Sequence, residues 1–202
     1  MDFRMEINGR TLEYVDADHL YLVDGVIVPK SITGLVKEKL GGDLYKDVDP
    51  EVLRRASERG TAIHDGISAV VLGQKDPDTQ EERNFMFLMK YYHLFPMQTE
   101  IPVILFHNGD PIAAGRLDLV LKDALTGLLG GADIKTTATL DKEYLFWQLN
   151  LYRIAYAQCY GLEWQFLRGI HLRDDTRKMQ EIPINEDMTM EFIEQIWREQ
   201  HE

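Results

Sequence analysis

Short runs of alternating apolar and polar residues fill the first part of the chain, with a period typical of half-buried strands. Asn8-Gly9 and Asp24-Gly25 interrupt these runs within residues 3–28. Both dipeptides favour positive φ and predict tight hairpin turns. The pattern therefore predicts a β-hairpin segment at the start of the chain.

Further along, apolar residues recur at helical spacing in some segments and in short strand-like runs in others. The strongest helix start is Asp49-Pro50, with Asp49 as N-cap and Pro50 at the first helical position. A short helix after the hairpin segment can be capped by Ser31 or Thr33. We expect helices over residues 34–40, 49–72, 78–94, 141–160 and 188–199, and strands over residues 100–106, 112–121, 128–134, 164–172 and 179–184.

The order of these elements predicts a mixed α/β fold whose sheet is packed between helices. No internal repeat, low-complexity segment or Pro/Gly/Ser linker divides the chain. We therefore expect a single domain over residues 1–202. Within it, residues 1–48 form an N-terminal β-hairpin and short helix, and residues 49–202 form the core.

Composition limits where the protein acts. The chain is 45% apolar and 28% charged, as is usual for a globular protein. No apolar run approaches the ~20 residues of a membrane span, and the N-terminus lacks the pattern of a secretory signal. Cys159 is the only cysteine, which excludes a disulfide framework and an iron–sulfur cluster held by this chain alone. We expect a cytoplasmic protein with no membrane partner.

The net charge of −12 argues mildly against a nucleic-acid partner, because such proteins usually carry a basic surface. Two considerations weaken this argument. A metal-dependent site must itself concentrate carboxylates, and an acidic body can still carry one basic groove.

The chemistry of the chain is concentrated in Gly115-Arg116-Leu117-Asp118 and Ala132-Asp133-Ile134-Lys135. Successive side chains of a strand point to opposite faces, so Asp133 and Lys135 share a face while Ile134 turns into the core. If the strand with Asp118 pairs with this one, two carboxylates and the Ile134 carbonyl can meet at one edge of the sheet. Hard oxygen ligands of this kind suit Mg²⁺ or Mn²⁺. The alternative is a strand end with two solvated charges.

A lysine beside such carboxylates has a specific use in phosphodiester cleavage. Lys135 can position the attacking water, help to lower its pKa, or stabilise the charge that grows on the phosphorane. A metal ion would activate the nucleophile and neutralise the non-bridging oxygens.

Two pairs of residues, each one helical turn apart, accompany these segments. Gly60 and His64 share a helical face. The glycine allows a backbone or a phosphate to approach the helix closely. His64 offers an imidazole nitrogen to a metal. A lone helical histidine is otherwise usually structural. Gln148 and Tyr152 present hydrogen-bonding groups that could hold a phosphate or orient Lys135, although an amphipathic helix would show the same pair.

Taken in order, Gly60…His64, Gly115…Asp118, Asp133-Ile134-Lys135 and Gln148…Tyr152 resemble the PD-(D/E)XK nuclease superfamily in its RecB-like exonuclease branch. That family's pattern is Gly-x-x-x-His, Gly-x-x-Asp, Asp-x-Lys and Gln-x-x-x-Tyr. The matched region covers about the central half of the chain. Residues 19–33 also resemble the entry segment of phage-encoded nucleases and of the mitochondrial genome maintenance exonuclease.

The resemblance implies a restriction-endonuclease-like core and an Mg²⁺- or Mn²⁺-dependent exonuclease that acts on DNA ends. It implies metal-ligand roles for His64, Asp118, Asp133 and the Ile134 carbonyl, with one or two ions bound. Lys135 becomes the catalytic lysine, supported by Gln148 and Tyr152. A bacterial or phage origin fits the resemblance. No helicase motif or P-loop is present, so any unwinding or recombination role needs a separate partner.

Candidate DNA contacts lie close to these motifs. Arg54, Arg55 and Arg59 precede His64 on the same helix, and Thr136 and Lys142 follow Lys135. Of the three arginines we favour Arg59, one turn before the metal face, as a contact to the phosphate backbone, together with Gly60, Thr61 and Thr136. Glu100 heads the strand before Asp118 and is equally compatible with a place in the site and with an exposed strand start.

Two other functions compete with nuclease activity. One is a binding module for nucleic acid or protein that keeps the fold without catalysis, which the acidic balance favours. Against it, carboxylates held close together without a metal repel one another. The other is hydrolysis of a non-nucleic phosphoester, which only the family resemblance disfavours.

Overall fold

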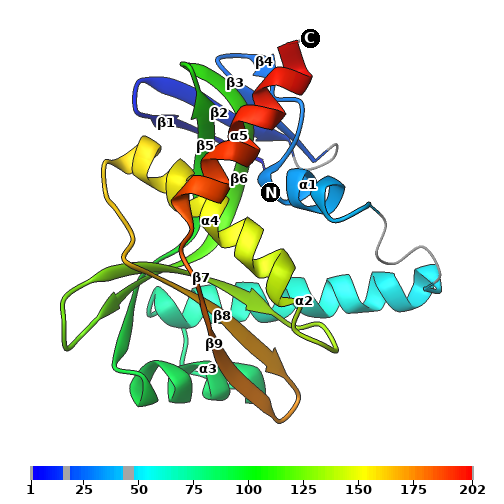
Figure 1. Ribbon diagram of the computed structural model, residues 1–202. Helices are drawn as coiled ribbons and strands as arrows, with labels where there is room; N and C mark the ends of the chain where they lie inside the picture. Colours follow the sequence, from blue (N-terminus) through cyan, green and yellow to red (C-terminus); the bar gives the residue numbers. More distant parts are fainter. Residues whose placement is uncertain (1, 16–18, 43–47, 202) are drawn as a thin grey trace.

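The computed structural model describes residues 2–15, 19–42 and 48–201, which form a mixed α/β fold, as predicted (Figure 1). A five-stranded sheet carries helices on both faces, and a four-stranded sheet formed by the N-terminal strands lies at one end. The elements in chain order are β1 Phe3–Ile7, β2 Arg10–Val15, β3 Leu20–Val23, β4 Val26–Ile27, α1 Ile32–Lys39, α2 Pro50–Val71, α3 Gln80–Tyr91, β5 Leu94–His107, β6 Asp110–Asp123, β7 Leu129–Lys135, α4 Lys142–Tyr160, β8 Phe166–Arg173, β9 Thr176–Ile182 and α5 Glu186–His201.

The N-terminal sheet is an antiparallel meander in the order β1-β2-β3-β4. The turns between β1 and β2 and between β3 and β4 fall at the predicted dipeptides, where Asn8 and Gly9 have φ of 50° and 75° and Asp24 and Gly25 have φ of 52° and 79°. The amide of Asn8 donates a hydrogen bond of 3.1 Å to the carbonyl of Gln158, which ties the sheet to α4. The single predicted hairpin is therefore a larger sheet that is docked on the core.

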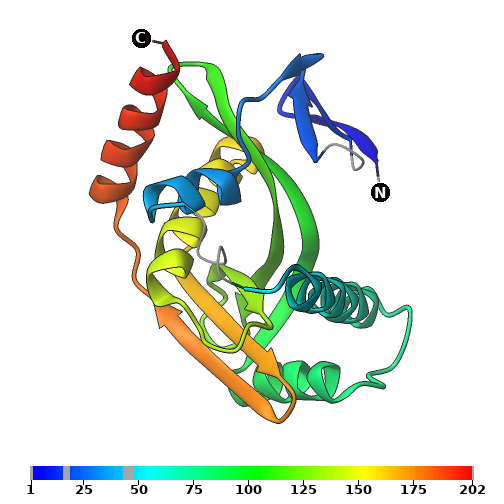
Figure 2. The ribbon, with the colours of Figure 1, turned by 90° about the vertical axis from the view of Figure 1, so that its right-hand side faces the viewer.

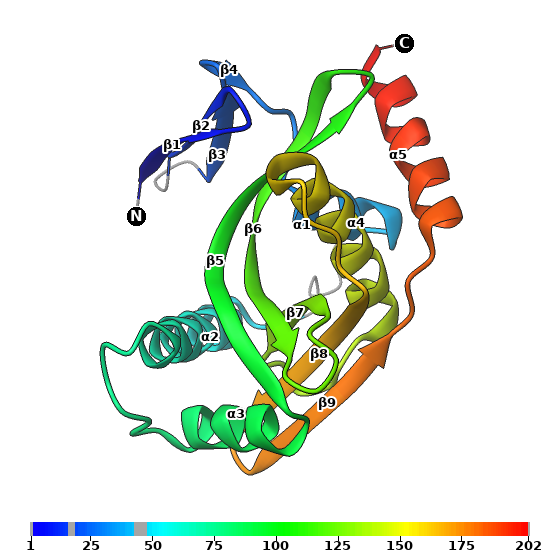
Figure 3. The same ribbon diagram turned by 90° about the vertical axis from the view of Figure 1, so that its left-hand side faces the viewer.

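The central sheet has the order β5-β6-β7-β8-β9, in which only the β7–β8 pair is parallel. Strands β5 and β6 are 14 residues each and form one long, curved hairpin (Figure 3). Strand β5 starts at Leu94, which the helical spacing had assigned to the end of the preceding helix. The helix ends earlier because Tyr92 is its C-cap and His93 has a φ of 55°, outside the helical region.

Side-chain caps fix where the helices begin. Asp49 caps α2 through the amide of Glu51, and Asp141 caps α4 through the amide of Tyr144. Ser31 rather than Thr33 caps α1. Helix α3 starts later than predicted because Thr79 is its N-cap and forms a capping box with Glu82. No helix in the described part of the chain is long and apolar enough to cross a membrane.

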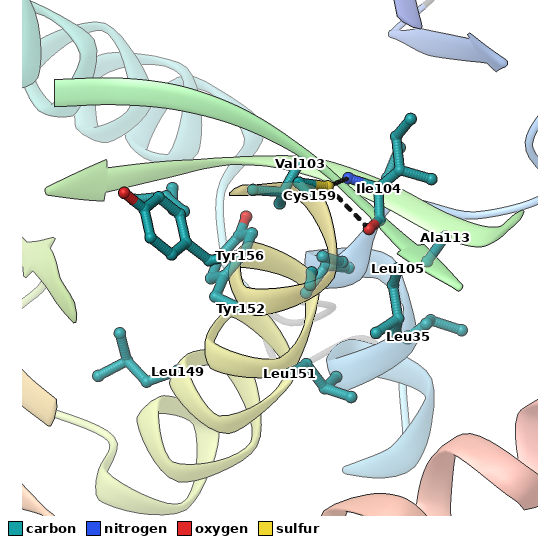
Figure 4. Packing of buried hydrophobic residues seen from close by; sticks show 14 of the residues in the cluster. Leu35, Val103, Ile104, Leu105, Ala113, Leu149, Leu151, Tyr152, Tyr156 and Cys159 are labelled. Carbon is teal, nitrogen blue, oxygen red and sulfur yellow. Dashed lines mark hydrogen bonds between the residues drawn. The ribbon is translucent and has the colours of Figure 1, made fainter. Parts of the chain in front are cut away.

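Figure 2 shows α1, α4 and α5 on one side of the central sheet and α2 and α3 on the other, and the buried hydrophobic residues form two separate clusters. One core joins α1, α4 and α5 to β5, β6 and the N-terminal sheet. Figure 4 shows part of it, where the Cys159 thiol of α4 accepts from the Ile104 amide at 3.2 Å and donates to its carbonyl at 3.3 Å. The other core joins α2 and α3 to the opposite face, through residues such as Ile67, Phe85 and Leu119. Helices from both faces of the central sheet therefore contact the β5–β6 hairpin.

A buried asparagine ties α4 to the segment before α5. The Asn150 amide donates to the carbonyls of Phe146 and Pro183, and its side-chain oxygen accepts from the Asn185 amide at 3.0 Å. Asn150→Ala would leave these buried groups unsatisfied, so we expect it to lower the free energy of unfolding by about 1–3 kcal/mol. Urea denaturation measures this, with the exposed Gln195→Ala as control. An Asn150→Ala protein as stable as the wild type would contradict the role of this network.

Candidate active site

Three carboxylates lie in one row across β5, β6 and β7. The β5–β6 register puts Glu100 opposite Asp118, and the β6–β7 register continued by one position puts Asp118 opposite Asp133. The strands that carry Asp118 and Asp133 are therefore neighbours, as predicted. Three acids in adjacent positions of a sheet repel one another unless cations compensate them.

Asp118 lies where β6 and β7 separate. Backbone pairing of the two strands ends at Leu119 and Ala132, and beyond it the Asp118 carboxylate accepts the Ile134 amide through Oδ2 at 2.6 Å. The side chain thus takes the place of a backbone acceptor, and this contact fixes its orientation. Oδ1 is turned toward α2, where it lies 3.5 Å from Nδ1 of His64.

Glu100 has an unusual backbone for a strand residue. Its φ is 54°, in the left-handed region that non-glycine residues rarely adopt. Such a conformation costs about 1–3 kcal/mol and persists only where surrounding structure imposes it, most often at functional sites. Its Oε1 lies 3.9 Å from His64 Nδ1, and its Oε2 forms an ion pair of 2.7 Å with Arg116. Glu100 therefore belongs to the site and is not an exposed strand start.

Helix α2 carries His64 to this row of acids. The ligand atoms of His64, Glu100 and Asp118 lie within 4.8 Å of one another, close enough for one metal ion. A Cβ at Gly60, one turn earlier, would meet the Thr136 hydroxyl at 3.2 Å, so the glycine allows α2 to approach the end of β7. The group that approaches Gly60 closely is therefore Thr136 of the protein itself.

Lys135 is held by two partners on its own side of the sheet. Its ammonium lies 2.6 Å from Asp133 Oδ2 and donates to Gln148 Oε1 at 2.9 Å. Asp133 and Lys135 thus share a face, as predicted, and the contact of Gln148 with the lysine is one of the alternatives that the sequence left open. The buried Asp133 Oδ2 has no hydrogen bond of good geometry, although the ammonium is near, so it retains capacity to accept another donor or a cation.

Burial and neighbouring charges set the protonation of the cluster. Burial acts to lower the pKa of His64, but Asp118 and Glu100 outweigh it and raise that pKa well above its ordinary value. Burial would raise the pKa of Asp118, but His64 and Lys135 hold it below its usual range. Burial raises the pKa of Asp133 to about 6. Burial opposes the charge of Lys135, yet Asp133 and Asp118 raise its pKa. The cluster is therefore a set of matched charges around Asp118.

The cluster opens into a cleft of about 290 Å³ between α2 and the N-terminal sheet, floored by β5 and β6. Tyr152 donates to the Arg116 carbonyl at 3.0 Å, and burial raises its pKa well above the ordinary value. Tyr21 of β3 closes the other wall, and its pKa is raised to about 12, mainly by burial. The residues that line the cleft are Tyr21, Ser31, Thr33, Gly60, Thr61, His64, Asp65, Glu100, Gly115, Arg116, Asp118 and Tyr152.

The predicted residues divide into those that the structure brings together and those that it does not. His64, Asp118, Gly60, Thr61 and Tyr152 line the cleft, and Asp133, Lys135 and Gln148 form a second group. Ile134 buries its side chain in the core, as predicted, and contributes its amide to Asp118.

Arg59 lies elsewhere. Its guanidinium pairs with Glu81 at 2.6 Å and with Asp174 at 2.8 Å, which ties α2 to α3 and to the β8–β9 turn. It does not line the cleft, and its predicted contact with DNA stays a prediction. The sequence did not indicate these ion pairs because the partners are 22 and 115 positions away. Arg54 and Arg55 pair with Glu51 on the exposed face of α2.

Sequence reasoning missed Arg116 and Tyr21 and left Glu100 undecided. Alternation along β6 puts Arg116 on the same face as Asp118, a signal that was available in the sequence, but its ion pair with Glu100 depends on the pairing of β5 with β6. Tyr21 belongs to a sheet whose docking on the core follows from tertiary contacts alone.

No family model matches the sequence, and a search of curated proteins finds no relative. Among solved structures, the crystal structure of SSO0001 is similar with a TM-score of 0.42 and 14% identity, over 85% of this chain and 76% of that chain. A likeness at this level carries no argument about function, so the site itself must supply the argument.

Proposed function

We propose that this protein is a divalent-metal-dependent deoxyribonuclease with a PD-(D/E)XK-type core, acting as an exonuclease on DNA ends. The observation that carries the proposal is the group formed by His64, Glu100 and Asp118, whose ligand atoms lie within 4.8 Å of one another. The nearby Lys135 and the cleft of about 290 Å³ add the catalytic cation and the space for a substrate. The ordered motifs add the substrate class, since they resemble a family of DNA nucleases.

The residues fit a divalent ion. One imidazole nitrogen and two carboxylate oxygens are a donor set suited to Mn²⁺ or Mg²⁺. The buried Asp133 Oδ2, which lacks a hydrogen bond of good geometry, offers a further oxygen beside them. An ion held by these residues would lower the pKa of a water molecule and neutralise phosphate oxygens. Ile134 remains a proposed ligand through its carbonyl.

The protein's own groups supply positioning and charge. Lys135, fixed by Asp133 and Gln148, offers an ammonium to the attacking water and to the charge that develops on phosphorus. Water adds to phosphorus and releases one proton, the bond to the leaving oxygen breaks, and that oxygen takes up one proton, so the net charge of the step is balanced. Tyr152 holds the strand segment at Arg116 in place and forms part of the cleft wall. These groups are held before substrate arrives, which is how fixed charges lower a barrier.

Nuclease assays with single- and double-stranded DNA and with Mg²⁺ or Mn²⁺ test the activity. We expect cleavage that chelation abolishes, and Lys135→Ala to lower the rate by about 10²–10³-fold because the fixed ammonium is lost. The exposed Lys37→Ala serves as a matched control. If the wild type cuts no DNA with either metal, or if Lys135→Ala cuts as fast as the wild type, the proposal fails.

The exonuclease mode has its own test within the same assays. Linear DNA offers ends and covalently closed circular DNA offers none. Degradation of linear DNA with intact circles supports the proposed mode, whereas cleavage of circles overturns it in favour of an endonuclease.

A binding module without catalysis has one specific observation in its favour. Each acid of the row has a cationic neighbour: Glu100 pairs with Arg116, Asp118 with His64 and Asp133 with Lys135. Cationic neighbours therefore compensate these acids without a metal, although, in addition to burial, the Asp118 carboxylate still acts to raise the pKa of Asp133, as expected for like charges. Isothermal titration with Mn²⁺ separates the two functions, because the binding module predicts no divalent site.

A further inference from the structure

Exposed aromatic side chains gather in one short segment of the chain. Among the described residues, the aromatic residues that are exposed are Phe87, Tyr91, Tyr92 and Phe95, all within nine consecutive positions at the end of α3 and the start of β5. Phe87 and Tyr91 are 43% and 65% exposed and stack with their centroids 5.9 Å apart. Tyr92 meets Tyr91 edge-on at 5.0 Å. Aromatic surface of this kind is costly to leave in water unless it has a partner.

The same face carries cations that no carboxylate neutralises. In the described part of the chain, every arginine except Arg83 and Arg177 forms an ion pair with an acid. Arg83 lies one turn before Phe87 on α3 and donates to the Asp78 carbonyl. The guanidinium of Arg177, on β9, lies 3.9 Å from the centre of the Phe87 ring. Both free arginines therefore flank the exposed rings.

This face lies on α3 and β9, which contact each other. Figures 1 and 3 show both elements at the end of the molecule away from the N-terminal sheet. Two acids of this region, Glu81 of α3 and Asp174 of the β8–β9 turn, both pair with Arg59. We call the surface formed by Arg83, Phe87, Tyr91, Tyr92 and Arg177 the aromatic face. It is separate from the cleft, since none of these residues lines it.

We propose that the aromatic face binds single-stranded nucleic acid outside the cleft. Flat rings stack on unpaired bases whatever their sequence, and arginines beside them attract the phosphates. A chain with a net charge of −12 that leaves two arginines uncompensated at one surface fits a polyanionic partner there. This inference rests on the proposed nuclease function. In such a nuclease, the aromatic face would hold a long strand while the end of that strand lies in the cleft.

Fluorescence anisotropy in the presence of EDTA tests binding without cleavage. The probe is a labelled thymidine oligonucleotide of about 30 nucleotides, longer than the ~4–16 nucleotides that one such binding surface covers. We expect the wild type to bind with a salt-dependent affinity. Phe87→Ala with Tyr91→Ala should weaken binding by about fivefold or more, as stacked rings do, and Arg177→Gln should weaken it and lower the salt dependence.

Two controls separate the aromatic face from general surface effects. Leu125→Ala removes a side chain that is 75% exposed in the β6–β7 turn, and Lys37→Gln removes an exposed cation of α1. Both should bind as the wild type does. Circular dichroism checks that each variant is folded. If the wild type does not bind the oligonucleotide, or if the variants of the aromatic face bind it unchanged, the proposal is overturned. Binding of poly-glutamate with no binding of the oligonucleotide overturns it in favour of an acidic protein partner.

Cleavage assays distinguish failure of this proposal from failure of the nuclease function. In a protein that cuts, Phe87→Ala with Tyr91→Ala should raise KM for long strands and leave kcat, and KM for oligonucleotides of about six nucleotides, unchanged. Unchanged KM for long strands contradicts the aromatic face alone. A wild type that binds the strand through this face yet cuts nothing contradicts the nuclease function alone.

Discussion

Asp118→Asn should abolish DNA cleavage while leaving the protein folded. The asparagine oxygen can still accept the Ile134 amide, which the native carboxylate accepts at 2.6 Å. It cannot supply the negative charge that faces His64 at the centre of the cluster. We expect the cleavage rate to fall by about 10³-fold or more, because both the metal site and the fixed charge are lost. Single-turnover cleavage and calorimetric titration with Mn²⁺ measure the two losses separately.

Asp65 provides the matched control, because its carboxylate lines the same cleft without belonging to the compact group. Asp65→Asn should cut DNA and bind Mn²⁺ nearly as the wild type does. Glu100→Gln tests the ligand that sequence reasoning left open and should weaken Mn²⁺ binding. An Asp118→Asn protein that retains full cleavage would contradict the assigned site, even if the protein proved to be a nuclease.

Gly131→Ala should destabilise the protein more than most single-atom additions do. A Cβ at Gly131 would lie 2.0 Å from the Trp164 ring, and Trp164 is only 1% exposed. The ring also packs against Tyr156, tilted by 30° with the centroids 4.9 Å apart, which opposes its movement away from Gly131. We expect the free energy of unfolding to fall by about 1–3 kcal/mol or more, and Tm to fall by roughly 2–4 °C per kcal/mol. Thermal and urea denaturation measure both quantities.

The cause of this loss can be separated from a general effect on β7. Trp164→Leu frees space above Gly131, so Gly131→Ala should cost less in that background than in the wild type. Additive losses would show that the clash with Trp164 is not the cause. A Gly131→Ala protein as stable as the wild type would show that β7 and the ring separate easily.

Local chemistry explains most of what the sequence predicted. The start of α2 followed from the capping side chain of Asp49, whose effect needs only the next few residues. The hairpin turns followed from Asn8-Gly9 and Asp24-Gly25. Alternation along β7 correctly put Asp133 and Lys135 on one face. The mixed α/β class followed from the order of the elements.

Features that depend on distant residues could not be predicted in the same way. Helical spacing extended α3 to Leu94 because an apolar residue continued the pattern, while His93 had already left the helical region. Glu100 joins the site through a left-handed backbone that its sequence neighbours do not indicate. Arg59 was expected at the groove, but residues from α3 and from the β8–β9 turn hold it away.

The wall that β3 adds to the cleft has a consequence for synthesis of the chain. The N-terminal sheet is made before the central sheet, yet it is anchored through the carbonyls of Gly109, 99 positions beyond Arg10, and Gln158, 150 positions beyond Asn8. Contacts between residues so far apart in the sequence form late in folding. Closing the long loop between them costs conformational entropy before the new contacts compensate that cost. A nascent chain therefore carries the aspartates of β6 and β7 before it has the enclosed cleft around them, and the wall is completed only when α4 has left the ribosome.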